Sequence, residues 1–212
     1  MTNKKNSPYS AAITGCAFLY SEFLHVLPLL MDENSTQLLK GEVLNNQILH
    51  VNSQKARQTF ITEFKRRYNA VPASFWKLFV EMDEPAQRAG LLYAILKAYK
   101  LAFDFHFNVT IKRWNSGETT LRKNDLMMEF CEISSRDGFV DSWTENTKDR
   151  CASQYLTILR QSGLLQEKTD ELHPIRLEKS DYAFYLRNGE EWFLEACLLY
   201  PYEIEELKNQ TV

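Results

Sequence analysis

Hydrogen-bonding and cationic side chains cluster in one short stretch of the sequence, between positions 146 and 154. Side chains of these types can bind nucleic acid. Amides, hydroxyls and guanidinium groups pair with base edges in the major groove, and amines and hydroxyls also bind phosphates. The residues are Asn146, Thr147, Lys148, Arg150, Ser153 and Gln154. We therefore predict that this stretch contacts double-stranded DNA.

A single amphipathic helix would present three of these residues on one outward side. Thr144 is a suitable N-cap, because its hydroxyl can accept a hydrogen bond from a first-turn amide, and Gly163 is typical of a helix end. At about 100° per residue, the inward positions are Cys151, Tyr155, Ile158 and Leu159, and the outward positions are Asn146, Arg150, Ser153, Thr157 and Arg160. Lys148 lies at the edge of the inward face, where it suits a phosphate better than a base.

A short β-hairpin is expected directly after this helix. Residues 164–168 can form a strand, 169–171 a turn, and 172–177 a return strand with Pro174 at its edge. Lys168, next to the turn, is included among the predicted DNA contacts. A recognition-type helix, a Gly-Leu-Leu sequence and a hairpin follow each other in this order in winged helix-turn-helix proteins. The same module can instead serve as a protein-docking unit.

A second group of cations lies in the N-terminal half. Lys55, Lys65 and Arg66 project from a predicted helix that starts after the N-cap Ser53, on the side opposite its apolar residues. Their charge would bind phosphates without reading sequence. Arg57 is included with them, although it lies nearer the apolar stripe, where a structural ion pair is the alternative. For the group as a whole, the alternative is an ordinary solvated face.

The residue patterns that support catalysis or metal binding are not found in the sequence. There is no glycine-rich phosphate motif, zinc-protease helix or nucleophile elbow. The four cysteines are far apart, lack nearby histidines and fit reduced core thiols better than a zinc site. His106, between Phe105 and Phe107, is expected to be a core histidine. We expect no enzyme activity, no catalytic residue, no metal and no cofactor.

The elements that position these residues are predicted to be mostly α-helical. Seven glycines and six prolines in 212 residues are too few for a many-stranded fold. We predict an N-terminal helical bundle over 1–114, a linker over 115–120, and a winged helix-turn-helix domain over 121–212 with an acidic helical tail. Apolar residues on nearly every side from Ala89 to Phe107 predict one long central helix.

The charge distribution is compatible with a nucleic-acid partner. The net charge is −3, but residues 190–212 contain six glutamates and one lysine, which leaves residues 1–189 at +2. Neither a signal-peptide pattern nor an apolar run of membrane-spanning length is evident. We therefore expect a cytoplasmic protein without a membrane partner.

The order of several short motifs resembles the small A component of bacteriophage exclusion (BREX) systems. The motifs are Ile13-Thr14-Gly15-Cys16-Ala17-Phe18-Leu19 with Ser21-Glu22, Ile48-Leu49 leading to Ser53, Arg57 and Arg66-Arg67, Trp143-Thr144-Glu145-Asn146-Thr147, and Leu159 with Gly163-Leu164-Leu165. The resemblance implies an all-helical protein with a winged-helix part, DNA binding, and service in a phage-defence complex beside a methyltransferase and ATPases. It also keeps RNA as a possible ligand, because the family has been compared with an RNA-binding antitermination factor.

Three functions follow as hypotheses. The first is a DNA-binding accessory subunit of phage defence that uses the 144–162 helix, its wing and the basic helix at 55–66. The second is a scaffold whose winged helix docks other defence subunits; acidic or apolar surface over Asn146 and Arg150 would favour it. The third is RNA binding by the N-terminal bundle, which would need exposed aromatic rings beside Lys55 and Lys65.

Overall fold

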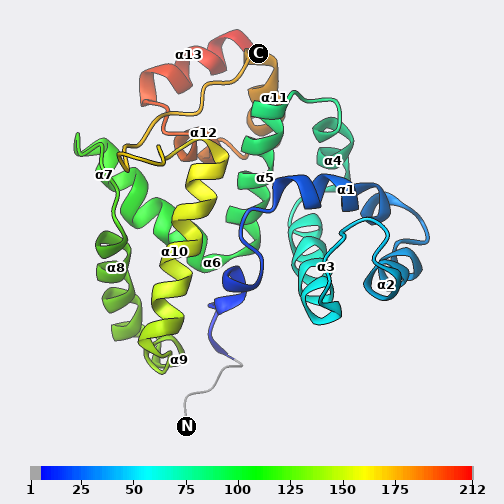
Figure 1. Cartoon of the computed structure of the whole chain (residues 1–212). Coiled ribbons are helices and arrows are strands. Elements are labelled where there is room, and N and C mark those ends of the chain that lie inside the picture. The colour runs from blue at the N-terminus through cyan, green and yellow to red at the C-terminus, as the bar shows by residue number, and fades with distance from the viewer. Residues whose placement is uncertain (1–5, 212) are drawn as a thin grey trace.

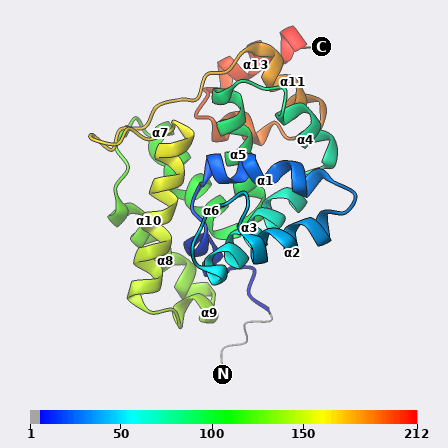
Figure 2. The same cartoon turned by 45° about the vertical axis from the view of Figure 1, so that its right-hand side comes forward.

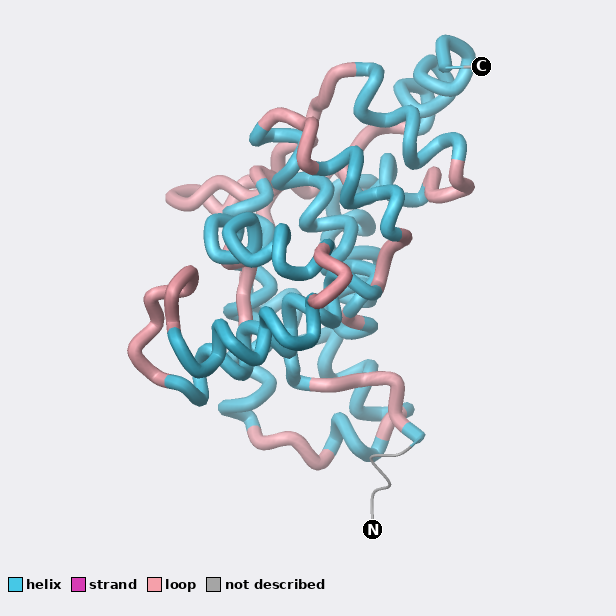
Figure 3. The backbone as a smooth tube through the Cα atoms, turned by 90° about the vertical axis from the view of Figure 1, so that its right-hand side faces the viewer, coloured by secondary structure: helices cyan, strands magenta, loops and turns pink. Residues whose placement is uncertain are grey.

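A computed structural model describes residues 6–211; residues 1–5 and 212, which the predicted domains include, lie outside this range. Helices joined by loops make up the described chain (Figure 3), which confirms the mostly helical class. The elements are η2 (Ala11–Gly15), α1 (Tyr20–Met31), α2 (Ser35–Asn45), α3 (Gln54–Asn69), α4 (Ala73–Phe79), α5 (Glu84–Ala98), α6 (Lys100–Phe105), the π-helix η3 (His106–Ile111), α7 (Lys112–Asn115), α8 (Lys123–Arg136), α9 (Gly138–Asp141), α10 (Glu145–Ser162), α11 (Lys179–Arg187), α12 (Trp192–Ala196) and α13 (Pro201–Thr211).

Local capping signals set the ends of several helices. Ser53 and Asp83 cap α3 and α5 by accepting hydrogen bonds from Ala56 N (3.3 Å) and Ala86 N (2.9 Å). Gly163 ends α10 with φ +91°, a left-handed conformation that costs glycine little. These signals lie within a few residues of each helix end, so sequence alone could find them.

Helix α5 forms the centre of the core, but it is shorter than predicted. Residues 89–96 are all buried, and a Cβ on Gly90 would lie 3.0 Å from the rings of Phe75 and Phe79. The predicted continuous helix over Ala89–Phe107 is wrong, because Tyr99 adopts an extended backbone (φ −128°, ψ +105°) between α5 and α6. This break brings the Tyr99 hydroxyl to Glu63 in α3, 2.9 Å away.

The predicted β-hairpin wing is not formed by strands in the described residues. Its place is taken by two isolated antiparallel bridges, Leu165 with Leu172 and Thr120 with Glu171, around a turn at 167–169. The pairing ends early because the chain after Leu172 turns toward α12, where Ile175 N donates to Cys197 O at 2.9 Å. The predicted return strand over 172–177 is therefore replaced by an extended segment that leads into α11.

Helices from both halves of the chain meet in one core. In Figures 1 and 2, α8 and α10 lie on one side of the molecule, α2 and α3 lie on the other, and α5 runs between them. Helix α10 packs on α5, α8 and the N-terminal η2, and η2 also contacts α3. The predicted linker contains a turn at Ser116–Gly117, where Gly117 has φ +80°. The division into two domains at this turn stays a prediction.

Candidate nucleic-acid interface

The outward face of α10 remains open to solvent at its N-terminal end. Asn146 and Arg150 are exposed and Ser153 is half-buried, whereas Cys151 and Tyr155 are completely buried. The predicted orientation of this helix is therefore correct at these positions. Because α5, α8 and η2 cover the other sides of α10, the exposed residues form a ridge, which we call the α10 ridge and define as Asn146, Arg150 and Ser153.

The charge of the α10 ridge comes mainly from one residue. Arg150 makes no hydrogen bond or ion pair with any residue that the structure describes, so its guanidinium is available to a ligand. The neighbouring cations are paired: Lys148 with Glu145 at 3.6 Å, and Arg160 with Asp170 at 2.7 Å. The ridge is thus polar with a single free cation, which is less cationic than the sequence predicted.

Two residues of the predicted contact set have other surroundings. The Thr147 hydroxyl lies 2.9 Å from that of Thr144, and the Thr147 amide donates to the same Thr144 oxygen at 3.2 Å, so Thr147 belongs to the helix cap. Gln154 is half-buried, and its side-chain oxygen is buried without a hydrogen-bond partner among the described residues. The structure therefore places Thr147 and Gln154 beside the ridge and not on its open face.

The turn after α10 presents Lys168 to solvent. Lys168 is exposed at the tip of the 167–169 turn and makes no ion pair among residues 6–211. The Arg160–Asp170 ion pair joins the base of this turn to α10, and the hydrogen bond from His173 N to Leu164 O at 2.9 Å pairs the two segments that flank the turn. The turn is consequently held at the C-terminal end of α10, at the opposite end from Asn146.

The predicted basic set in the N-terminal half divides into surface and core residues. Lys55, Lys65 and Arg66 are exposed on α3. Arg57 is buried and donates to the carbonyls of Val43 (2.8 Å), Val51 (2.6 Å) and Asn52 (3.1 Å). These bonds commit its guanidinium to the end of α2 and the α2–α3 connection, so the structure places Arg57 in the core and not with the exposed cations of α3.

Two features of this surface were not identified from the sequence. Lys40 on α2 is exposed near Lys65. It is an isolated cation in the sequence, so its place in a basic surface becomes evident only when α2 packs against α3. The short helix η2 lies between α3 and α10 and contacts both. It thereby connects the two surfaces that carry the predicted DNA contacts.

A buried polar cluster fixes α10 from behind. His106 is fully buried, as the sequence predicted for a core histidine, and its ring nitrogens lie 2.9 Å from the Tyr155 hydroxyl and 2.8 Å from Ala196 O. The Thr110 hydroxyl lies 2.8 Å from the same Tyr155 oxygen. Because Tyr155 is on α10 and His106 on η3, the cluster ties α10 to the core through hydrogen bonds.

The stability of the protein should depend on pH through His106. Burial lowers the pKa of His106 to about 4 from its ordinary 6.5. As the pH falls, His106 therefore takes up a proton in the unfolded chain before it does so in the folded protein. Its contribution to the free energy of unfolding is complete above about pH 6.5 and is lost progressively as the pH falls toward about 4. We expect urea unfolding to show a loss of about 2 kcal/mol between about pH 7 and about pH 5. In His106→Gln this pH dependence should shrink; an unchanged dependence would assign it to other groups.

Neither a metal site nor a membrane span stands out in the part of the chain that is described. No group of three or more His, Cys, Asp or Glu side chains there is arranged to hold a metal ion. None of the described helices combines the length and apolar character needed to cross a membrane.

Comparison with known proteins identifies the family. The sequence profile of the BrxA family matches residues 7–189, which is most of the chain. The chain belongs to the BrxA family. The resemblance to the A component of BREX systems is thereby confirmed, and this BrxA-family chain is a component of BREX phage defence.

Two similar proteins extend this result. The BREX protein BrxA of Bacillus cereus (strain H3081.97) is 23% identical over 164 residues, which cover 77% of this chain and 82% of the relative. A crystal structure of an uncharacterized protein from Magnetospirillum magneticum superposes with a TM-score of 0.75 at 18% identity, covering 91% of this chain and 98% of that one. The similarity to the Magnetospirillum magneticum protein concerns the fold alone, and it shows that this arrangement of helices also occurs in a crystal structure.

Proposed function

We propose that this BrxA-family chain is a non-enzymatic DNA-binding component of a BREX system, and that the α10 ridge contacts duplex DNA. The observation that carries the proposal is the exposure of Asn146 and Arg150 at the N-terminal end of a long, capped helix. Asparagine and arginine make the bidentate contacts that read adenine and guanine in a major groove. The N-terminal end of α10 also favours a phosphate, through its unpaired amides and helix dipole.

The arrangement around α10 supports a winged helix-turn-helix type of contact. Helix α8 packs against both α9 and α10, so a short helix precedes the long one as in a helix-turn-helix. The 167–169 turn with Lys168 occupies the position of a wing, although bridges replace its strands. We propose that Lys168, with Lys55, Lys65 and Arg66 on α3, binds phosphates and adds no sequence preference.

The double substitution Arg150→Ala with Ser153→Ala tests this function. We expect duplex affinity to fall by about tenfold or more, since a good bidentate contact contributes roughly 1–3 kcal/mol. Affinity of the unsubstituted protein should also fall steeply with salt because counterions are released on binding. Fluorescence anisotropy with a labelled duplex gives both quantities. The matched control is Arg187→Ala with Ser180→Ala, two exposed positions of α11, which should change little. Equal affinities for the two variants would remove α10 from the interface.

A docking function is the second candidate, because two exposed carboxylates precede Arg150 in the first turns of α10. Glu145 and Asp149 retain 82% and 52% side-chain exposure, and Asp149 pairs with Lys123 at 2.9 Å. This acidic component would suit a basic surface on another defence subunit. Glu145→Gln with Asp149→Asn separates the two functions by the sign of its effect. Duplex affinity should rise if α10 binds DNA, and binding to a BREX partner should weaken if α10 is a docking face.

No observation favours the RNA-binding alternative. Tyr99, whose ring lies 5.8 Å from the Arg66 guanidinium, is buried. The partly buried rings of α3 near its basic positions are those of Phe60 and Tyr68, which pack against the core. The Tyr68 ring stacks on Trp76 at 5.6 Å. Neither ring offers the exposed face on which an unpaired base could stack.

A further inference from the structure

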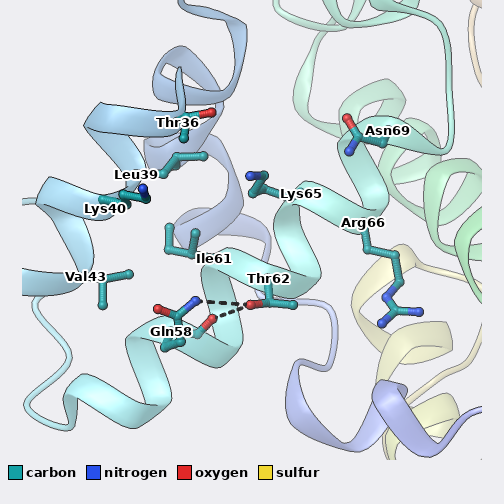
Figure 4. Close-up of a pocket in the computed structure, with 10 residues that line it drawn as sticks. All are labelled: Thr36, Leu39, Lys40, Val43, Gln58, Ile61, Thr62, Lys65, Arg66 and Asn69. Carbon is teal, nitrogen blue, oxygen red and sulfur yellow. Dashed lines mark hydrogen bonds between the residues drawn. The ribbon is translucent and has the colours of Figure 1, made fainter. Parts of the chain in front are cut away.

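A cationic groove lies between α2 and α3, away from the α10 ridge. It encloses about 470 Å³. Its lining residues, drawn in Figure 4, are Thr36, Leu39, Lys40, Val43, Gln58, Ile61, Thr62, Lys65, Arg66 and Asn69. The two helices run antiparallel because the short connection at 46–53 reverses the chain, so residues from the start of α2 face residues from the end of α3. This pairing brings cations together that are far apart in sequence.

The groove has an apolar floor and a polar rim. Leu39, Val43 and Ile61 are buried, with exposed fractions of 2%, 6% and 3%, and form the floor. The rim carries amides and hydroxyls: the Thr62 hydroxyl donates to Gln58 O at 2.8 Å, and the Gln58 amide lies 3.4 Å from the Thr62 hydroxyl. Thr36 and Asn69 face the groove near its other end (Figure 4). Neutral hydrogen-bonding groups of this kind accompany cations in phosphate sites.

The sign of the charge distinguishes this groove from other hollows of the surface. None of its ten lining residues is Asp or Glu. Four other pockets among the described residues each include at least one carboxylate, represented by Glu22, Glu190, Asp125 and Glu203. The absence of a carboxylate from the lining favours anions, since every charge among the lining residues is positive.

Two of the three cations are free to bind. Arg66 pairs with Glu63 at 3.0 Å, so part of its charge is already neutralised. Lys40 and Lys65 are exposed and make no ion pair or side-chain hydrogen bond with a described residue. Both side chains line the groove, and Figure 4 shows Lys65 extending from α3 toward α2 with Lys40 on the α2 wall. Two lysines that flank one hollow would repel each other, and a bound anion would remove this repulsion.

We infer that the α2–α3 groove binds phosphate groups of a polynucleotide backbone, with Lys40 and Lys65 as the principal contacts. The identity of the polymer rests on the proposed function; the anion site itself rests on the lining of the groove. Helix η2 contacts both α3 and α10, so the groove and the α10 ridge lie on either side of one short element. One nucleic acid could therefore engage both, and the groove would add affinity without sequence preference.

The test is the double substitution Lys40→Ser with Lys65→Ser. Its matched control is Lys77→Ser with Lys179→Ser, which removes the same charge from exposed positions of α4 and α11. Labelled duplex DNA is titrated by fluorescence anisotropy between about 50 and about 200 mM salt. Each phosphate contact contributes about 0.9 to the salt dependence of log K on B-DNA, so the groove variant should reduce that slope by about 2. Its affinity at about 0.1 M salt should fall by about tenfold or more, and the control should keep the original slope.

Two further titrations separate the possible outcomes. If the unsubstituted protein binds duplex but the groove variant behaves like the control, the groove inference is overturned together with the phosphate contact of Lys65, and the proposed contact through the α10 ridge stands. If the unsubstituted protein binds no duplex, the proposed function fails, and pyrophosphate becomes the probe of the groove. Pyrophosphate should then shift the amide NMR signals of Thr36, Thr62 and Asn69 in the unsubstituted protein but not in the groove variant, which would support an anion site in the groove. If pyrophosphate shifts none of these signals in the unsubstituted protein, the groove inference is overturned. Displacement of duplex by polyglutamate as effective as by unlabelled duplex would assign the groove to an acidic protein segment and contradict the inference.

Discussion

Replacing Arg67 with methionine is expected to lower the free energy of unfolding by about 3–5 kcal/mol. Arg67 is completely buried on α3, and its guanidinium donates to three successive carbonyls: those of Cys16 and Ala17, and that of Phe18 at 2.7 Å. Methionine has a similar volume but no donors, so three buried carbonyls would lose their partners. Each such loss costs roughly 1–3 kcal/mol.

The control for this substitution is Arg187→Met, an exposed arginine at the end of α11. Urea unfolding should show a change within about 0.5 kcal/mol for this surface variant. Because residues 16–18 follow η2 directly, Arg67→Met should also loosen the contact between η2 and α10. Faster amide exchange in residues 11–18 would report this effect. A loss of stability below about 1 kcal/mol would show that the guanidinium is not the structural centre of this region.

Replacing Glu42 with alanine should have the second largest effect, about 3 kcal/mol. The Glu42 carboxylate is buried at the end of α2 and accepts hydrogen bonds from the amides of Gln47 (3.1 Å), Ile48 (3.1 Å) and Leu49 (2.8 Å). Alanine would leave all three amides unpaired in the connection between α2 and α3. Glu42→Gln retains one acceptor oxygen and should cost less than Glu42→Ala.

Urea unfolding of the two Glu42 variants can be compared with Glu81→Ala, which removes an exposed carboxylate and should be nearly neutral. Amide exchange should accelerate first at Gln47–Leu49, because these are the donors that lose their acceptor. The α2–α3 groove should lose anion affinity in Glu42→Ala, since the connection sets the spacing of its two walls. Equal stability of Glu42→Ala and Glu81→Ala would contradict this account of the connection.

The parts of the fold that were predictable from sequence are those with local causes. The bounds of α10 depend on a hydroxyl at Thr144 and a left-handed glycine at Gly163, both adjacent to the helix ends. The exposure of Asn146 and Arg150 follows from helical periodicity against a buried side that contains Tyr155. Such features require no knowledge of what packs against the helix.

The parts that were mispredicted depend on contacts between distant residues. No residue pattern near Tyr99 predicts the break between α5 and α6. At this break the Tyr99 hydroxyl donates a hydrogen bond to Glu63 on α3. The return strand of the wing is shortened because Ile175 pairs with Cys197 near α12. The sequence placed Arg57 near the apolar stripe but could not decide between a DNA contact and a structural role. The three carbonyls that bind it lie at the end of α2 and in a connection whose path the sequence does not reveal.

The same distinction holds for the candidate site, where contacts on one helix were predictable and contacts that need two packed helices were not. The α10 ridge lies on one helix, so its residues could be selected from a single amphipathic pattern. The α2–α3 groove needs two helices in register, and Lys40 acquires a role only when Lys65 stands across from it. Thr147 and Gln154 were predicted as DNA contacts from their residue types. In the folded chain Thr147 belongs to the helix cap and the Gln154 side-chain oxygen is buried, so neither lies on the open face.

The most direct test of the central claim is site-specific crosslinking from the α10 ridge to DNA. A photoreactive benzoylphenylalanine is introduced at position 146, and separately at position 187 on α11 as a control, and each protein is irradiated with labelled duplex. We predict a crosslinked protein–DNA species for position 146, which disappears when Arg150→Ala is added, and none for position 187. Binding of duplex without a crosslink from position 146, or with equal crosslinking from position 187, would contradict the assignment of α10 as the DNA-contacting helix.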